Sequence, residues 1–246
     1  LVVGSNPPYF GAARLSALAA LRSGAGIVAI ATRQQHVALM NLSCPELICH
    51  ATENRAALTS LVTAYNAVVI GPGLGDDLWA QEMLAAVLEC DLPVVIDADG
   101  LNELARDPVA KANWIITPHP GEAARLLNCS TASIQQDRFE AARQLQQKYQ
   151  ANIVLKGSGT LIKTQAQGLE LCTRGNPGMA SGGMGDVLAG LLGGLWVQGL
   201  DIDTVTRLGV QIHAHAADLA AQADGERGLL ATDLLPYIRR LVNANS

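Results

Sequence analysis

The sequence predicts an α/β fold, with a mostly parallel sheet that carries helices on both faces. Short apolar runs alternate along the chain with amphipathic or Ala/Leu-rich stretches of helical length. Hydrophobic residues make up 49% of the chain and aromatic residues only 4%, so Ala, Leu, Val and Ile must build the core, as in layered α/β proteins. Four apolar runs end directly in a Gly, Asp, His or Lys motif. Because ligands of open α/β sheets bind at the carboxyl ends of the strands, we expect these motifs to lie together.

The first two thirds of the chain supply the alternating elements. Buried strands are expected at the opening stretch LVVGS and at 26–32, 47–50, 67–70, 93–96, 114–117 and 152–155. Helices are expected at 11–23, 34–40, 54–63, 77–90, 101–106, 121–127 and 134–150. Pro120 suits the first turn of the helix at 121–127. Ser133 and Gln136 resemble a capping box that opens the helix at 134–150.

The last third of the chain has a different pattern. Two short runs, 160–164 and 169–173, are separated by QAQG and predict a β-hairpin. Three helices follow, at 184–197, 203–223 and 232–243. Asp201 or Asp203 is expected to cap the second of these helices, and Thr232 the third.

Size, charge and cysteine usage narrow the class of protein. A chain of 246 residues allows one large α/β domain or two small ones. The net charge is −5 and no Lys/Arg run exceeds two residues, which argues against nucleic-acid and membrane partners. The opening strand has no basic region before it, so it is not a signal peptide, and we expect that the beginning of the chain is truncated or was fused to another domain. Five cysteines without CxxC spacing favour reduced, mostly buried thiols in a cytoplasmic protein.

The stretch 175–195 (GNPGMASGGMGDVLAGLLGGL) holds eight of the 24 glycines. A glycine-rich loop runs into an apolar helix with one acid, Asp186, at its start. Free N–H groups and the positive end of a helix dipole bind phosphate, and an acid there is placed to take a proton from a neighbouring group. The alternative is a flexible loop followed by a helix that Asp186 caps.

Two motifs follow the strands at 67–70 and 93–96. Gly71 to Gly75 (GPGLG) forms a tight turn that lets a ligand lie against the backbone, although it lacks the GxGxxG spacing of a dinucleotide site. Asp97 and Asp99 either hold a magnesium ion through water or a substrate hydroxyl, or form a solvated turn in which Asp99 caps the next helix.

Two further motifs follow the strands at 114–117 and 152–155. His119 lies between two prolines, so its backbone is constrained and its ring has a fixed direction. A neutral imidazole there suits a polar substrate group, and a surface loop histidine is the alternative. Lys156 to Thr160 (KGSGT) combines a cation with a glycine turn, which suits a nucleotide phosphate or a plain hairpin turn, and it is not a P-loop.

Taken together, GPGLG, DADGLN, TPHPGEAARLL, VLKGSGTLI and GNPGMASGGMGDVLAG resemble, in this order, the ADP-dependent NAD(P)H-hydrate dehydratases. The resemblance extends from Gly11 to about Asp233 and implies a ribokinase-like three-layer sandwich formed by residues 1–246 as one domain. The family removes water from the hydrated cofactors NADHX and NADPHX while it consumes ADP, and it releases NAD(P)H, AMP and phosphate. Phosphorylation of the C6 hydroxyl turns a poor leaving group into a good one, which the lone pair of the ring nitrogen can expel.

The resemblance also implies roles for particular residues. Asp186 would be the base that takes the C6 hydroxyl proton, and backbone N–H groups near Gly185 would stabilise the transferred phosphoryl group. The nucleotide would be held by Lys156, Gly157, Ser158, Gly159 and Thr160. The hydrated cofactor would be lined by Ala12, Gly73 and His119, with further substrate or magnesium-water contacts at Asp97, Asn102 and Asn176. Mg²⁺ is expected on the nucleotide phosphates without a direct protein ligand.

The chain departs from the family pattern at Met184, which replaces the Thr of the usual GTGD motif and removes one candidate phosphate contact. In many bacteria the dehydratase follows an epimerase domain, for which this chain has no room, and bacterial relatives are homo-oligomers, which leads us to expect a tetramer. Two alternatives stay open: a ribokinase-like kinase of a small heterocyclic alcohol, and a non-catalytic nucleotide sensor. The retained Asp186 argues against the sensor, because a pure binder has little need of a base there.

Overall fold

The computed structural model of the chain describes residues 1–40, 42, 44–166 and 168–243. Nine strands form one sheet in the order β3-β2-β1-β4-β5-β6-β7-β8-β9. The strands from β3 across to β7 pair in parallel, and β8 and β9 add an antiparallel hairpin at one edge. The mostly parallel α/β sheet predicted from the sequence is therefore confirmed.

All nine strands are short. Their bounds are Val2–Val3 (β1), Ala29–Thr32 (β2), Ile48–Ala51 (β3), Val68–Ile70 (β4), Val94–Ile96 (β5), Trp114–Ile116 (β6), Asn152–Leu155 (β7), Thr160–Lys163 (β8) and Leu169–Cys172 (β9). Strands β1, β2, β4, β5, β6 and β7 are buried, as the apolar runs predict, but every residue of β3 is half-buried or exposed, so the expectation of a buried strand at 47–50 is wrong. The hairpin is confirmed by the antiparallel pairing of β8 with β9, although Gln167 in its QAQG turn lies outside the described residues.

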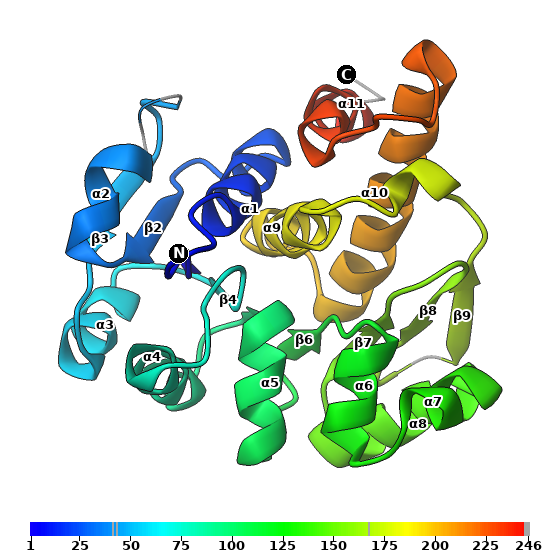
Figure 1. Cartoon of the computed structure of the whole chain (residues 1–246), viewed down its shortest axis with the longest axis horizontal. Helices are drawn as coiled ribbons and strands as arrows, with labels where there is room; N and C mark the ends of the chain where they lie inside the picture. The colour runs from blue at the N-terminus through cyan, green and yellow to red at the C-terminus, as the bar shows by residue number, and fades with distance from the viewer. Residues whose placement is uncertain (41, 43, 167, 244–246) are drawn as a thin grey trace.

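Helices cover both faces of the sheet, which gives three layers (Figure 1). On one face lie α1 (Ala12–Arg22), α9 (Met184–Trp196), α10 (Ile202–Asp224) and α11 (Leu234–Leu241). On the other lie α3 (Arg55–Val62), α4 (Leu78–Leu88), α5 (Ala98–Arg106), α6 (Pro120–Leu127), α7 (Thr131–Gln136) and α8 (Arg138–Tyr149). Helix α2 (Gln34–Met40) lies near the β3 edge, and two short 3-10 turns cover Pro177–Met179 (η1) and Ala231–Asp233 (η2).

Alternate residues of each central strand supply the two cores. In β4, Val69 packs in the core under α1 and α9, while Val68 and Ile70 pack in the core on the opposite face. The same split separates Val95 from its two neighbours in β5 and recurs in β6 and β7. Successive side chains of a strand point to opposite faces of the sheet. Because helices cover both faces here, nearly every residue of these strands is apolar.

The contact between α1 and α9 depends on glycine. An added Cβ at Gly190 would lie 1.9 Å from the carbonyl oxygen of Ser16, and one at Gly194 would lie 2.1 Å from Ser23 Oγ. These glycines therefore let the two helix backbones approach closely. The apolar helix of the glycine-rich stretch is thus held against α1 as well as against the sheet, and its N-terminus is fixed in position.

Three details of the predicted helices are wrong. The helix expected at 134–150 is two helices, α7 and α8, because Ser130 caps the first and Asp137 the second through side-chain hydrogen bonds to backbone N–H groups. Ser133 with Gln136 is therefore not a capping box. Thr232 lies inside η2 and does not cap α11, which begins with Asp233 as a cap without a side-chain hydrogen bond. The expectation that Asp201 or Asp203 caps α10 is confirmed for Asp201, whose side chain accepts a hydrogen bond from the backbone N–H of Thr204.

Two other expectations concern thiols and membranes. All five cysteines are free, as expected, but only Cys44 and Cys172 are buried, so the expectation that most are buried is wrong. Within the described ranges, no helix combines the length and the apolar character needed to span a bilayer.

The replacement Gly190→Ala is expected to destabilise the fold. Alanine favours a helix by about 1 kcal/mol over glycine, but a Cβ 1.9 Å from a carbonyl oxygen forces the two helix backbones apart. Overpacking of this kind costs about 1–3 kcal/mol or more. We expect a net loss of about 2 kcal/mol in the free energy of unfolding, measured by urea denaturation. Gly26→Ala, where an added Cβ meets nothing within 4 Å, is the control. A Gly190→Ala variant as stable as the control would contradict the close contact.

Candidate active site

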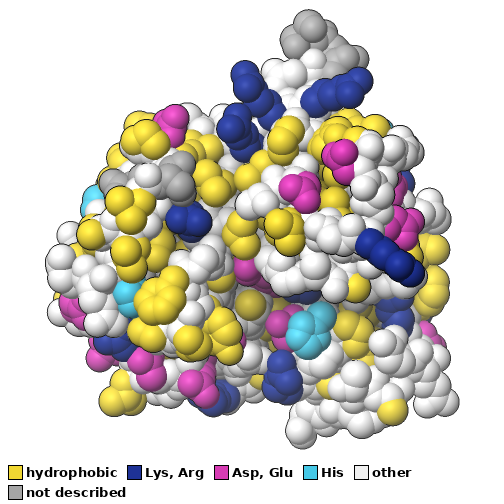
Figure 2. Space-filling model, turned by 45° about the horizontal axis from the view of Figure 1, so that its top comes forward, with side chains coloured by type: hydrophobic (Ala, Val, Ile, Leu, Met, Phe, Trp, Pro, Cys, Tyr) yellow, Lys and Arg dark blue, Asp and Glu magenta, His cyan; other side chains and the backbone are white. Residues whose placement is uncertain are grey.

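The predicted motifs lie together at the carboxyl ends of the central strands. Strands β5, β6 and β7 are neighbours, and each is followed at its carboxyl end by a polar residue: Asp97, Thr117 and Lys156 respectively. The N-terminus of α9 meets these strand ends, since an added Cβ at Gly185 would lie 3.3 Å from Lys156 Nζ and 3.4 Å from Asp97 Oδ2. Seen from this side, the molecule has a hollow that contains acidic, basic and histidine side chains (Figure 2).

A buried ion pair lies among these strand ends. Lys156 Nζ is 2.5 Å from Asp97 Oδ1, and the same carboxylate oxygen accepts a hydrogen bond of 2.6 Å from Thr117 Oγ1. The Asp97 side chain is 1% exposed and that of Lys156 is 20% exposed. The pair joins the ends of β5 and β7 across β6, so it links the predicted nucleotide motif to the DADG motif. Asp97 is also the N-cap residue of α5, although its side chain makes no capping hydrogen bond there.

Glu122 is a second buried acid beside Lys156. Its Oε2 is 3.7 Å from Lys156 Nζ and accepts a hydrogen bond of 2.7 Å from the backbone N–H of His119. Burial raises the pKa of Glu122, and the charge of Asp97 adds to that rise, while Lys156 opposes it. The Lys156 ammonium therefore faces two carboxylates.

His119 has a fixed direction because it caps α6. Its Nδ1 accepts hydrogen bonds from the backbone N–H groups of Gly121 (2.9 Å) and Glu122 (3.3 Å). Nδ1 therefore carries no proton, and the neutral ring carries it on Nε2, which lies 3.4 Å from Glu122 Oε1. Burial and the nearby cations Lys156 and Arg125 lower the pKa of His119, which favours this neutral form. Pro120 occupies the first turn of α6, as expected.

Asp186 lies in the first turn of α9 and does not cap the helix. The N-cap is Gly183, with φ +89° and no side-chain hydrogen bond. The left-handed backbone at this position favours glycine. The interpretation of Asp186 as a capping residue is therefore wrong, and its carboxylate is left for another role beside the free N–H groups of the helix.

Burial raises the pKa of Asp186 to about 6, and the negative charges of Asp97 and Asp99 contribute to the rise. Lys156 acts in the opposite direction. A carboxyl with this pKa is ionised at neutral pH and is still basic enough to accept a proton. Nearby carboxylates also act on Lys156: burial alone would lower the pKa of its ammonium, but Asp97, Glu122 and Asp186 raise it overall. Lys156 therefore stays charged.

A cavity of about 710 Å³ opens beside the ion pair. The predicted nucleotide residues line it together: Lys156, Gly157, Ser158, Gly159, Thr160 and Gly185. His119, Asn176 and Met184 also line it, as do the apolar side chains of Leu188, Val210 and Met179. One end of the cavity is thus cationic and rich in glycine, and another part of its wall is apolar. That combination suits a ligand with an anionic group and a flat apolar group.

Asn176 is held by a residue that the sequence did not single out. Its Nδ2 donates to Asp218 Oδ1 over 3.1 Å, its Oδ1 accepts from Gly178 N, and Asp218 Oδ2 accepts from Gly175 N. Asp218 lies on α10 and so anchors the loop that forms this wall of the cavity. The side chain of Asn176 shapes that loop.

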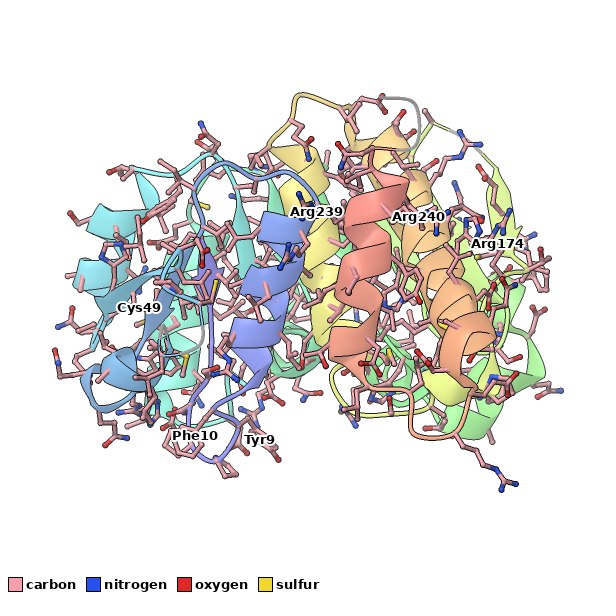
Figure 3. The ribbon with its side chains drawn as sticks, turned by 90° about the horizontal axis from the view of Figure 1, so that it is seen from above. Tyr9, Phe10, Cys49, Arg174, Arg239 and Arg240 are labelled. Carbon is pink, nitrogen blue, oxygen red and sulfur yellow. The ribbon has the colours of Figure 1, made fainter. Side chains whose placement is uncertain are left out.

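Of the residues predicted to line the hydrated cofactor, His119 lines the cavity of about 710 Å³, whereas Ala12 and Gly73 do not. An added Cβ at Gly73 would lie 2.7 Å from Tyr9 Cβ and 3.0 Å from Ala12 Cβ, so Ala12 and Gly73 are neighbours. Tyr9 is 57% exposed on the loop before α1, and it lies with Phe10 at one edge of the molecule (Figure 3).

Asp99 and Asn102 join this region to α6. Asp99 Oδ2 accepts from Gly75 N over 2.9 Å, and Asp99 Oδ1 accepts from Asn102 Nδ2 over 3.4 Å. Asn102 Oδ1 in turn accepts from Arg125 Nε over 2.7 Å. Asp99 therefore fixes the GPGLG turn from inside α5, and the suggestion that it caps α5 is wrong, since the N-cap is Asp97.

A magnesium ion held only by protein ligands does not fit the described residues. No group of three or more His, Cys, Asp or Glu side chains among them is arranged to hold a metal. Asp97 Oδ1 already accepts hydrogen bonds from Thr117 and Lys156, while its Oδ2 lies toward the start of α9. The residues present fit a Mg²⁺ that is carried on the phosphates of a ligand.

Sequence reasoning missed Thr117, Glu122 and Asp218. Glu122 stands three residues after His119, which is the spacing of a capping box, but histidine is not a usual N-cap residue. Thr117 is the first residue of the TPHPGE motif, and its residue type gives no sign of which side chain it bonds. Asp218 is one of several acids on a long helix, and only its contact with the loop reveals its function.

The sequence model of the NAD(P)H-hydrate dehydratase family matches residues 1–240 of this chain. The bifunctional NAD(P)H-hydrate repair enzyme Nnr of Coxiella burnetii is 54% identical over 243 residues, which cover 99% of this chain and 50% of that protein. The repair enzyme Nnr of Escherichia coli is 44% identical and is covered over 47% of its length. The chain therefore spans about half the length of these curated relatives.

Solved structures agree with this assignment of the fold. The ADP/ATP-dependent NAD(P)H-hydrate dehydratase of Bacillus subtilis, co-crystallised with ATP/Mg²⁺ and soaked with CoA, superposes with a TM-score of 0.86 at 31% identity, over 98% of this chain and 88% of that chain. Hydroxyethylthiazole kinase of Pyrococcus horikoshii superposes with a TM-score of 0.66 at 15% identity, over 95% of this chain and 97% of that chain. The likeness to the kinase shows a shared fold alone.

Asp97→Asn is expected to lower the pKa of Asp186 below about 6, because it removes a negative charge that raises that pKa. Carboxyl chemical shifts followed by NMR during a pH titration would measure the change. Asp107→Asn, at an exposed position at the end of α5, is the control and should leave the titration of Asp186 in place. An unchanged or higher pKa in Asp97→Asn would contradict the charge coupling described above.

Proposed function

Because the chain belongs to the NAD(P)H-hydrate dehydratase family, we propose that it converts hydrated NADH or NADPH to NADH or NADPH while consuming ADP. The single observation that carries the proposal is the position of Asp186. It follows Gly185 of the cavity wall, its pKa is raised to about 6, and Lys156 and Asp97 lie beside it. A base at that place has a use only if a ligand brings a proton to it.

The proposed reaction begins with a phosphoryl transfer. Asp186 accepts the proton of the C6 hydroxyl, the hydroxyl oxygen attacks the terminal phosphorus of ADP, and AMP leaves. The N–H groups at the start of α9, near Gly185, stabilise the charge on the transferred phosphoryl group. Lys156 and the glycines that follow it hold the phosphates of the nucleotide. Mg²⁺ on the phosphates supplies further charge neutralisation when it is bound.

The second part of the reaction breaks the C6–O bond. The lone pair of the ring nitrogen expels phosphate, and loss of a proton from C5 restores the C5–C6 double bond. The products are NAD(P)H, AMP, hydrogen phosphate and one proton released to solvent, so atoms and charges balance. His119, with Nδ1 engaged by α6, presents Nε2–H as a donor to a polar group of the hydrated cofactor, whose other contacts are Ala12 and Gly73. Asn102 donates a hydrogen bond to Asp99, which in turn accepts one from Gly75 in the same turn as Gly73.

We also propose that residues 1–246 act as one dehydratase unit, that the unit forms a homo-oligomer, and that it works in the cytoplasm. The relatives are described as bifunctional repair enzymes of about twice this length, which supports a second activity elsewhere in those proteins. Light scattering coupled to gel filtration would measure the oligomeric state.

The activity is tested by incubating the protein with enzymatically hydrated NADH, ADP and Mg²⁺ and following the recovery of dihydronicotinamide absorbance. We expect recovery together with release of AMP and phosphate. Failure with both ADP and ATP would contradict the proposal. A kinase of a small heterocyclic alcohol would show no recovery and would instead transfer phosphate to such an alcohol.

Asp186→Asn is expected to lower kcat by about a hundredfold or more, since removal of a general base typically costs that much. AMP binding should be retained, because the cavity and Lys156 are unchanged. Steady-state kinetics and calorimetric titration with AMP would measure the two quantities. Normal turnover by this variant would show that another group is the base.

The pH dependence of kcat should follow the ionisation of Asp186. The carboxylate is the active form, and its pKa is raised to about 6, so kcat should be constant above that pH and fall tenfold for each unit below it. Initial rates with saturating substrates between pH 5 and 8 would measure the profile. A rate that stays level down to pH 5 would exclude Asp186 as the base with this pKa.

A further inference from the structure

The turn from Lys156 to Thr160 has an unusual hydrogen-bond pattern. Three carbonyl oxygens, two within the turn and one just before it, accept hydrogen bonds from side chains: Arg138 Nη1 donates to Ser158 O over 2.8 Å, Arg138 Nη2 to Leu155 O over 3.3 Å, and Thr160 Oγ1 to Gly157 O over 3.2 Å. Within the turn, the carbonyl oxygens of Gly157 and Ser158 are therefore occupied by side chains of the protein.

The N–H groups of the same turn have no such partners. Within the described part of the chain, the backbone N–H groups of Gly157, Ser158 and Gly159 donate to no protein acceptor. All three residues line the cavity of about 710 Å³. With the carbonyl oxygens of Gly157 and Ser158 occupied and three successive N–H groups left over, the turn offers donors to the cavity, which is the arrangement that binds an anion.

Arg138 is built into the back of this turn. It is the first residue of α8, which Asp137 caps, and α8 packs against β7 and β8 on either side of the turn (Figure 1). An added Cβ at Gly157 would lie 2.9 Å from Arg138 Nη2, and φ at Gly157 is +150°. Glycine at this position thus makes room for the guanidinium. Arg138 does not line the cavity, so it acts on a ligand only through the turn.

We propose that Arg138 is a positioning residue that holds the Lys156–Thr160 turn with its N–H groups free for the phosphate of the nucleotide. The guanidinium fork fixes two carbonyl oxygens at once, which a single-point donor cannot do. The inference rests on the proposed function, because it assumes that this cavity takes an adenine nucleotide. Arg138, although it lies outside the cavity, thus contributes to the affinity for the phosphate of that nucleotide.

The test compares the affinities for AMP and for adenosine, which differ by the phosphate alone. AMP affinity is measured by calorimetric titration and adenosine affinity by ligand-observed NMR, on the wild type, Arg138→Ala and Arg138→Lys. Arg143→Ala is the matched control: Arg143 lies on the same helix, is half exposed and pairs with Glu140.

We expect Arg138→Ala to weaken AMP binding about tenfold and to leave adenosine binding unchanged. Arg138→Lys should lose part of that affinity, and Arg143→Ala should match the wild type. If Arg138→Ala does not fold, Arg138→Lys decides the matter by the same comparison. AMP affinity equal to the wild type, or equal losses for AMP and adenosine, would overturn the proposal. A wild-type protein that binds neither AMP nor ADP would instead contradict the nucleotide dependence of the proposed function itself.

Discussion

The ion pair between Lys156 and Asp97 is the interaction on which the candidate site depends. It joins residues 59 positions apart and connects the ends of β5 and β7, with Thr117 of the intervening segment bonded to the same carboxylate oxygen. Removing one partner of a buried pair typically costs about 3–5 kcal/mol, because the other charge is left uncompensated. Here the pair also sets the charge around Asp186: Asp97 raises its pKa and Lys156 lowers it. The same ion pair therefore holds two strand ends together and influences the pKa of the proposed base, Asp186.

Close approach of backbone to backbone makes this arrangement possible. Gly185 leaves space for the ion pair against the start of α9, and Gly190 lets α9 lie directly on α1. At Gly71 an added Cβ would lie 1.7 Å from the carbonyl oxygen of Asp97, so the GPGLG turn and the DADG turn also meet without a side chain between them. These glycines therefore stand at positions where two elements of the chain meet without a side chain between them.

Much of the fold and part of the site could be predicted from the sequence. The parallel sheet follows from apolar runs that end in polar motifs, and β7 was predicted with the bounds it has. The break between α7 and α8 was missed because Ser130 and Asp137 cap helices through local geometry that several neighbouring polar residues could equally supply. Glu122 and Arg138 were missed because their importance comes from tertiary contacts with Lys156 and with the turn after β7. The capping function of His119 was hidden because its residue type is rare at that position.

We propose that the candidate site transfers a phosphoryl group to the substrate hydroxyl before the carbon–oxygen bond breaks. The most direct measurement follows the oxygen atom of that hydroxyl. Hydrated NADH carrying heavy oxygen at C6 would be turned over with ADP and Mg²⁺, and the released phosphate would be analysed by mass spectrometry. We expect the heavy oxygen to appear in the released phosphate. Heavy oxygen found in water, with unlabelled phosphate, would contradict the proposal, because the hydroxyl would then have left without being phosphorylated.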